Sequence, residues 1–182
     1  FSWTRSTLNR GVFATRGSSQ SVSAEVSVPG STLQFYKFFF NAERYFPLNR
    51  EWSLRFRTEI GYGDGYGDTP ALPFYEHFYA GGFGSIRGFE TSTLGPRSTP
   101  PLDPEGNPIY FRDRDGEPFG GNLLFELSAE LIFPMPFVED NRQFRPVFFV
   151  DAGNVFNTKC PEVSVNCFGF ERENFRYSVG LG

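Results

Sequence analysis

The chain has 182 residues with a formal net charge of -4 at pH 7, and 24 of its residues are Phe, 20 are Gly and 14 are Pro. Because Phe favours strands while Gly and Pro favour turns, this composition predicts an all-β protein. The acidic balance argues against nucleic acid as a partner. No apolar run is long enough for a membrane-spanning helix.

Alternating apolar and polar residues predict strands along most of the chain. The clearest case is the run 51–62, where Arg55, Arg57 and Glu59 share one face while apolar residues share the other. In the run 33–46, Phe39 and Arg44 break the alternation. The predicted strands are a tail at 2–7 and six full runs at 20–28, 33–46, 51–62, 122–133, 143–156 and 175–182.

The length of these runs separates two all-β architectures. Strands in a soluble sandwich have about five or six residues, whereas a tilted strand that crosses a membrane needs about nine to eleven. Runs of ten to fourteen residues with a charged second face fit a wall between lipid and a water-filled lumen. We therefore expect part of a transmembrane antiparallel β-barrel, and a soluble β-sandwich stays as the less favoured alternative.

The connections between the runs alternate in length, as in outer-membrane barrels. Short turns at 45–50 and 134–141 are expected at one end of the strands. Longer, Gly-rich connections are expected at the other end, among them the segment at about 63–121. A segment of this length is rarely passive, and its glycines, prolines and charges give it no core of its own. It is therefore expected to be either disordered or packed inside the barrel.

The two cysteines, Cys160 and Cys167, flank one of the longer connections. Two cysteines around a short polar loop predict a disulfide and an oxidising compartment. Two free thiols remain the alternative, because the sequence does not show how close the Cα atoms come.

Three motifs carry a resemblance to a known family. Two lie in the long loop, Phe78-Tyr79-Ala80-Gly81-Gly82 and Ile86-Arg87-Gly88-Phe89, and the third is the Asp151-Ala152-Gly153 strand. Together they resemble the BamA family, the barrel subunits of the bacterial β-barrel assembly machine. The resemblance implies a sixteen-strand outer-membrane barrel with the second motif at the tip of an extracellular loop folded into the lumen. Residues 1–182 would be a partial barrel domain of about seven strands, with the terminal strands and the periplasmic repeat domains outside this chain.

Arg87 is the candidate site residue within that tip motif. An arginine brought into a confined lumen needs acceptors for its planar set of donors. Glu130 and Asp151 lie on the polar faces of consecutive runs, and the resemblance places the acidic partners of the family's arginine at these positions. Gly88 would allow a sharp backbone turn. The alternative is a solvated arginine in a loose loop, with Phe89 in ordinary loop packing.

The sequence shows no constellation typical of catalysis or metal binding. His77 is the only histidine and has no neighbouring ligand or nucleophile in the spacings that such sites use. We therefore expect no enzyme activity, no cofactor and no metal. The resemblance implies a factor that folds and inserts outer-membrane proteins, with unfolded clients, accessory lipoproteins and outer-membrane lipids as partners. A two-partner secretion pore or a passive porin-like channel stays as the alternative function.

Overall fold

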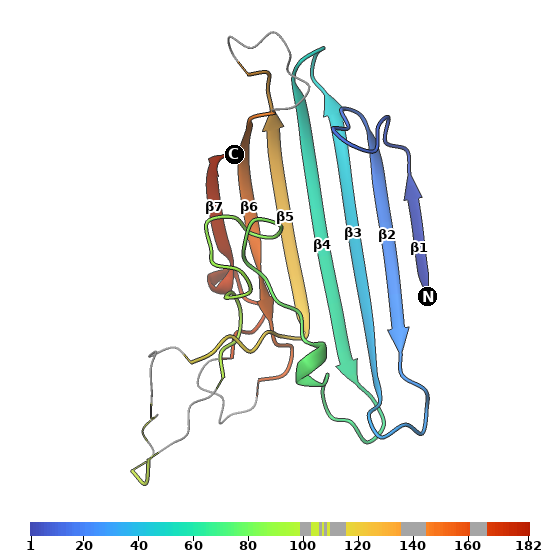
Figure 1. The fold of residues 1–182 in the computed structure, drawn as a ribbon. Coiled ribbons are helices and arrows are strands. Elements are labelled where there is room, and N and C mark those ends of the chain that lie inside the picture. The colour runs from blue at the N-terminus through green and yellow to red at the C-terminus, as the bar shows by residue number, and fades with distance from the viewer. Residues whose placement is uncertain (99–102, 106, 108, 110–115, 136–144, 161–166) are drawn as a thin grey trace.

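The computed structural model describes residues 1–98, 103–105, 107, 109, 116–135, 145–160 and 167–182. Within them, seven strands form one antiparallel sheet in which each strand pairs with its neighbours in the chain (Figure 1). The predicted all-β fold and the number of strands are confirmed. The strands are β1 (Ser2–Ser6), β2 (Gly17–Val26), β3 (Phe35–Pro47), β4 (Ser53–Gly65), β5 (Leu123–Ile132), β6 (Val147–Phe156) and β7 (Arg176–Leu181).

Most strand bounds lie within a few residues of the predicted runs, and the largest instructive difference is at β4. This strand continues to Gly65, past the predicted end at residue 62, because it stays paired with β3 as far as Phe35. Gly61, Gly63 and Gly65 have no side chains, so the alternation that reveals a strand is lost there although the backbone ladder continues. The start of the predicted run 143–156 lies outside the described residues, and β6 begins at Val147.

The two faces of the sheet differ as the alternation predicts. On one face, Arg55 and Arg57 of β4 lie opposite Glu130 and Ser128 of β5. The other face is a continuous apolar surface, on which Phe38, Phe56, Leu127, Phe148 and Val150 are each 42–48% exposed. An exposed apolar face opposite a charged face fits a wall between lipid and an aqueous lumen. No helix in the described part of the chain is long and apolar enough to cross a membrane.

The connections gather at two ends of the sheet, as predicted (Figure 1). The connections after β1, β3 and β5 lie at one end, here called the short-turn end, and part of the predicted turn 134–141 is outside the described residues. The connections after β2, β4 and β6 lie at the other, the long-loop end. They carry two 3-10 helices, η1 (Phe74–Glu76) and η2 (Arg172–Asn174).

The long connection between β4 and β5 packs over the polar face of the sheet, where Figure 1 shows its green segment in front of β5 to β7. Isolated bridges hold this segment together, including those from Phe78 to Gly121 and from Ala80 to Leu94. Of the two expectations for this segment, the structure shows the packed one: the segment shares a core with the sheet. That core contains Ala80, Ile86 and Leu94 of the loop with Leu124 of β5 and Val155 of β6.

The two residues that break the alternation in β3 both have local explanations. Phe39 lies on the polar face and stacks on Phe78 of the long loop, with ring centroids 6.4 Å apart. It therefore belongs to the margin of the shared core. Arg44 lies on the apolar face near the short-turn end, and its guanidinium is 4.6 Å from the centroid of the Phe46 ring.

The predicted disulfide between Cys160 and Cys167 is present, with the Cα atoms 5.7 Å apart. Both cysteines lie in the connection between β6 and β7, at the long-loop end. Nearby, Lys159 forms an ion pair with Asp64 at 2.7 Å, and the side-chain amide of Asn122 donates to Thr158 at 2.8 Å. The cysteine connection is thereby attached to both ends of the long loop, at β4 and just before β5.

Candidate functional site

The tip of the long loop is a tight turn that delivers Arg87 to the sheet. The backbone N–H of Gly82 donates to the carbonyl of Ile86 at 3.2 Å, which closes the turn. Ile86 is fully buried in the shared core and so holds one side of the tip in place. Gly88 has φ +85°, a conformation that side chains other than glycine's rarely allow. The turn expected at Gly88 is therefore present.

Arg87 contacts both of the acids expected for it. Its Nε and Nη2 donate to the two carboxylate oxygens of Asp151 at 2.7 and 2.6 Å, in a bidentate arrangement. Its Nη1 donates to Glu130 at 2.7 Å, and the guanidinium carbon lies 3.7 Å from the centroid of the Phe149 ring. The hydrogen bonds with Asp151 are the main cause that raises the pKa of Arg87 above its ordinary value. The loop thus carries a permanent positive charge into a site built from β5 and β6.

Asp151 is the most enclosed member of this cluster, with no exposed surface. Besides the guanidinium, it accepts the backbone N–H of Arg87 at 3.1 Å and the hydroxyl of Ser128 at 2.6 Å. The Ser128 oxygen also accepts a hydrogen bond from Arg87 at 3.0 Å. A buried carboxylate is tolerated when a charge and several donors satisfy it, and removal of one partner is then costly.

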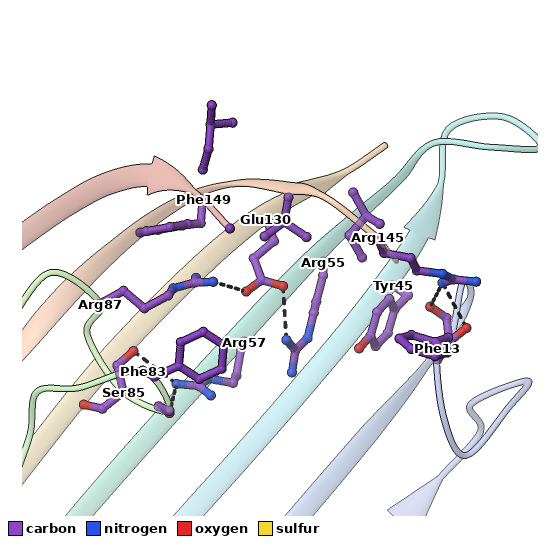
Figure 2. A pocket seen from close by; sticks show the side chains of 16 residues that line it. Phe13, Tyr45, Arg55, Arg57, Phe83, Ser85, Arg87, Glu130, Arg145 and Phe149 are labelled. Atoms are coloured by element: carbon purple, nitrogen blue, oxygen red, sulfur yellow. Dashed lines mark hydrogen bonds and ion pairs between the residues drawn. The ribbon is translucent and has the colours of Figure 1, made fainter. Parts of the chain in front are cut away.

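Glu130 connects this cluster to the rest of the wall (Figure 2). Its second oxygen accepts from Arg55 of β4 at 3.1 Å, and Arg55 also donates to Glu43 of β3 at 2.9 Å. Alternating charges therefore run from β6 through β5 and β4 to β3. Because Glu130 accepts hydrogen bonds from both Arg87 and Arg55, the loop is attached to a network rather than to one strand.

A second attachment lies beside the first. Arg57 of β4 donates to the carbonyl of Gly84 at 2.6 Å, and Figure 2 shows Arg57 beside Ser85 of the loop. The hydroxyl of Ser85 is hydrogen-bonded to Glu126 of β5. Five residues of this site were not predicted from the sequence: Ser85, Arg55, Arg57, Glu126 and Ser128. The signal for the last four was their place on the polar faces of the runs, whereas nothing in the local sequence distinguished Ser85.

A cavity of about 650 Å³ opens between the loop tip and the short-turn end. Figure 2 shows its polar lining, with Arg55, Arg57, Arg87 and Glu130 together and Arg145 further along the wall. Within the described residues, no group of three or more His, Cys, Asp or Glu side chains could hold a metal ion. His77 contacts the carbonyl oxygen of Phe119 at 3.0 Å, away from this cluster. The arrangement can hold a loop in place by charge.

Comparison with known proteins agrees with this architecture. The Omp85 superfamily domain matches residues 1–182. The chain belongs to the Omp85 superfamily. Within it, the outer membrane protein assembly factor BamA of Neisseria meningitidis serogroup B is 40% identical over 157 residues, which are 86% of this chain and 18% of that protein. The Homo sapiens homologue of sorting and assembly machinery component 50 is 30% identical over 120 residues, covering 64% of this chain and 22% of that protein.

The fold is also that of a solved Omp85 barrel. The crystal structure of BamA from Haemophilus ducreyi lacking POTRA domains 1-3 matches 99% of this chain with a TM-score of 0.79 and 32% sequence identity. The match covers 34% of the crystallised chain, so this chain spans about a third of that chain and less than a fifth of the Neisseria relative. The predicted fold and location are confirmed: the sheet is part of the wall of an outer-membrane β-barrel.

Proposed function

We propose that this chain is the central part of an outer-membrane protein assembly factor, a barrel that folds and inserts other β-barrel proteins into the bacterial outer membrane. The Omp85 domain and the assembly factors among the relatives support the proposal. Under this proposal, residues 1–182 are a partial barrel domain whose long loop spans about 63–121. Periplasmic repeat domains and the remaining strands of a sixteen-strand barrel belong to the rest of the protein.

The observation that carries the proposal is the attachment of Arg87 to Glu130 and Asp151. It gives each residue of the tip motif a positioning role. Ile86 is buried in the shared core, Phe89 packs against that core, and Gly88 makes the turn. The tip of the loop is thereby attached to the inner wall both by ion pairs and by packing.

This function requires no covalent step, cofactor or metal. Its partners are unfolded outer-membrane proteins as clients, accessory lipoproteins of the assembly machine and outer-membrane lipids, and nucleic acid is not among them. The energy for insertion comes from the client itself, because burial of its backbone hydrogen bonds and apolar strands in lipid is favourable once a closed barrel forms.

The test uses the full-length protein in phospholipid vesicles, with protection of a client barrel from protease as the measure of insertion. Arg87→Ala should lower the insertion rate several-fold while the barrel itself keeps its heat-resistant migration in detergent. Arg172→Ala is the matched control, since Arg172 is an exposed arginine of η2 without an ion pair in the described structure. Equal insertion by wild type and Arg87→Ala would remove the role assigned to the motif.

The same vesicles test the alternative function. A two-partner secretion pore or a passive porin-like channel would release trapped small solutes or pass its own substrate without inserting client barrels. Solute release by the wild-type protein, together with no protection of any client, would contradict an assembly factor and support a channel.

A further inference from the structure

Charge is distributed unequally between the two ends of the wall. On the connections at the long-loop end, the exposed acids Asp68, Glu105, Glu117, Glu171 and Glu173 outnumber the exposed bases Lys159 and Arg172. At the short-turn end, the described residues include five exposed arginines and one exposed acid, Glu51. We call these arginines the basic rim: Arg5, Arg10, Arg16, Arg44 and Arg50. The segment 136–144 lies outside the described residues, and its sequence holds two acids and one arginine, fewer acids than the basic rim has arginines.

Two arginines of the basic rim lie on the apolar face of the sheet rather than in a turn. Arg5 of β1 shares that face with Trp3, and Arg44 of β3 shares it with Phe46 and pairs with Phe56 of β4. From the spacing between strands and the rise per residue, the Cα atoms of Arg5 and Arg44 are roughly 12 Å apart. In the described structure neither has a carboxylate within ion-pair distance.

The position of these arginines identifies the level of the lipid head groups. A guanidinium facing lipid is costly at the centre of a bilayer and nearly free of cost at its interface. Tryptophan side chains favour the same interface. The chain has two of them, Trp3 beside Arg5 and Trp52 in the turn beside β4, and Trp52 stacks on Phe133 with ring centroids 5.6 Å apart. The lipid-facing arginines and the two tryptophans therefore indicate the same membrane–water interface, at the short-turn end.

We propose that the basic rim binds anionic glycerophospholipids in the leaflet at the short-turn end, through the phosphate of their head groups. A guanidinium forms two parallel hydrogen bonds with a phosphate, which suits Arg5 and Arg44 on the lipid face. The arginines in the turns add attraction for a head group with net negative charge, and a zwitterionic head group lacks that charge. The proposal requires only that the wall lies in a membrane, so it is independent of the assembly activity.

The test uses Trp3 and Trp52 as reporters in the full-length protein. The protein is reconstituted into phosphatidylcholine vesicles that contain an equal fraction of either brominated phosphatidylglycerol or brominated phosphatidylcholine, both of which quench nearby tryptophan. Subtraction of the signal from a Trp3→Phe/Trp52→Phe protein isolates the two reporters. We expect stronger quenching by the anionic lipid, and we expect added salt to reduce the difference because it screens exposed charges.

Charge variants then assign the preference to the basic rim. Each of Arg5→Gln and Arg44→Gln should reduce the preference for the anionic lipid about fivefold. Arg5→Lys/Arg44→Lys should keep most of it, because the charge remains. Arg172→Gln/Arg176→Gln, which removes two charges at the long-loop end, should keep all of it and is the matched control.

Three results would overturn the proposal. One is equal quenching of the wild-type protein by both brominated lipids, which would leave the basic rim free for an acidic protein instead. Another is an unchanged preference in Arg5→Gln/Arg44→Gln, and the third is an equal loss in the control pair. If the double glutamine variant fails to insert, as judged by its heat-resistant migration in detergent, the single variants and the salt series on the wild-type protein still decide.

Discussion

The polar face of the sheet has a covered region and an open one, and their residues differ in kind. Over β5 and β6, where the long loop lies, the face carries Glu130 and Asp151, which are 8% and 0% exposed. Over β1 and most of β2, where no described segment of this chain lies, it carries small hydroxyl side chains. These are Ser2, Thr4, Ser6, Ser19, Ser21 and Ser23.

The difference shows what charge contributes on this wall. A hydroxyl can exchange its hydrogen bonds with water at little cost. The serine side chains of β1 and β2 therefore do not require a protein segment to cover them. A buried ion pair adds little net stability, but it penalises every arrangement that separates its charges. The arginine cluster therefore determines where the loop lies, while the shared apolar core around Ile86 supplies burial. Single substitutions can remove these contributions one at a time.

The largest effect is expected from Arg87→Ala. This change leaves Asp151 buried with Ser128 as its remaining side-chain partner, so the attached state of the loop should lose about 3 to 5 kcal/mol. Limited proteolysis of the full-length protein in detergent should cut the segment 63–121 much faster than in wild type, while the strands stay resistant. An unchanged cleavage rate would mean that the core alone holds the loop.

Asp151→Ala should have a larger effect than Glu130→Ala. Asp151 accepts three hydrogen bonds from Arg87, including one from its backbone, whereas Glu130 accepts one. After Glu130→Ala, Arg87 keeps Asp151 and Arg55 keeps Glu43. We expect losses of about 3 kcal/mol for Asp151→Ala and about 1.5 kcal/mol for Glu130→Ala, measured by the same proteolysis. Equal losses would show that the network responds as a single unit.

Arg87→Lys tests whether charge alone is sufficient. An ammonium group keeps the charge but cannot present planar donors to Asp151 and Glu130 at once. We expect the attached loop to lose about 1 to 2 kcal/mol, less than in Arg87→Ala, and cleavage at a rate between those of wild type and the alanine variant. If the loop of the lysine variant resists protease as well as the wild-type loop does, the planar arrangement of the guanidinium donors is not needed to hold it.

The site was predictable from the sequence to the extent that it rests on alternation. The period of two places Glu130 and Asp151 on polar faces, and with them Arg55 and Ser128, because every second residue of a strand shares a face. Which of these meets Arg87 depends on the register between strands and on the path of a loop more than forty residues away in sequence. The family resemblance supplied that pairing, and the local pattern could not.

Other features could not be predicted from the sequence, for equally physical reasons. The end of β4 was missed because glycines show no alternation, and the shared core was missed because its apolar residues are scattered through the loop. Ile86, Leu94 and Ala80 form a core only together with Leu124 of β5 and Val155 of β6, which lie far from them in the sequence. The two strand positions, apolar where the lumen face should be polar, were the available signal.

The smallest effects are expected from two serines that occupy the same face in the two regions. Ser128 is 8% exposed, donates to Asp151 and accepts from Arg87, whereas Ser21 faces the lumen in the open region with no side-chain hydrogen bond in the described structure. Ser128→Ala leaves two buried polar groups each short of a partner, so it should cost the attached loop about 1 kcal/mol. Ser21→Ala should change the free energy of unfolding by less than about 0.5 kcal/mol, because the substitution breaks no hydrogen bond within the described structure.

Paired measurements on the full-length protein, by loop proteolysis and by the temperature at which its heat-resistant migration is lost, would separate the two serines. Faster loop cleavage in Ser128→Ala with an unchanged Ser21→Ala would confirm that the difference between the regions is the covering loop, since the two substitutions remove the same atoms from the same face of one sheet. Equal behaviour would mean that the hydroxyl of Ser128 is replaced by water, and the lumen beneath the loop would then be wetter than the complete burial of Asp151 indicates.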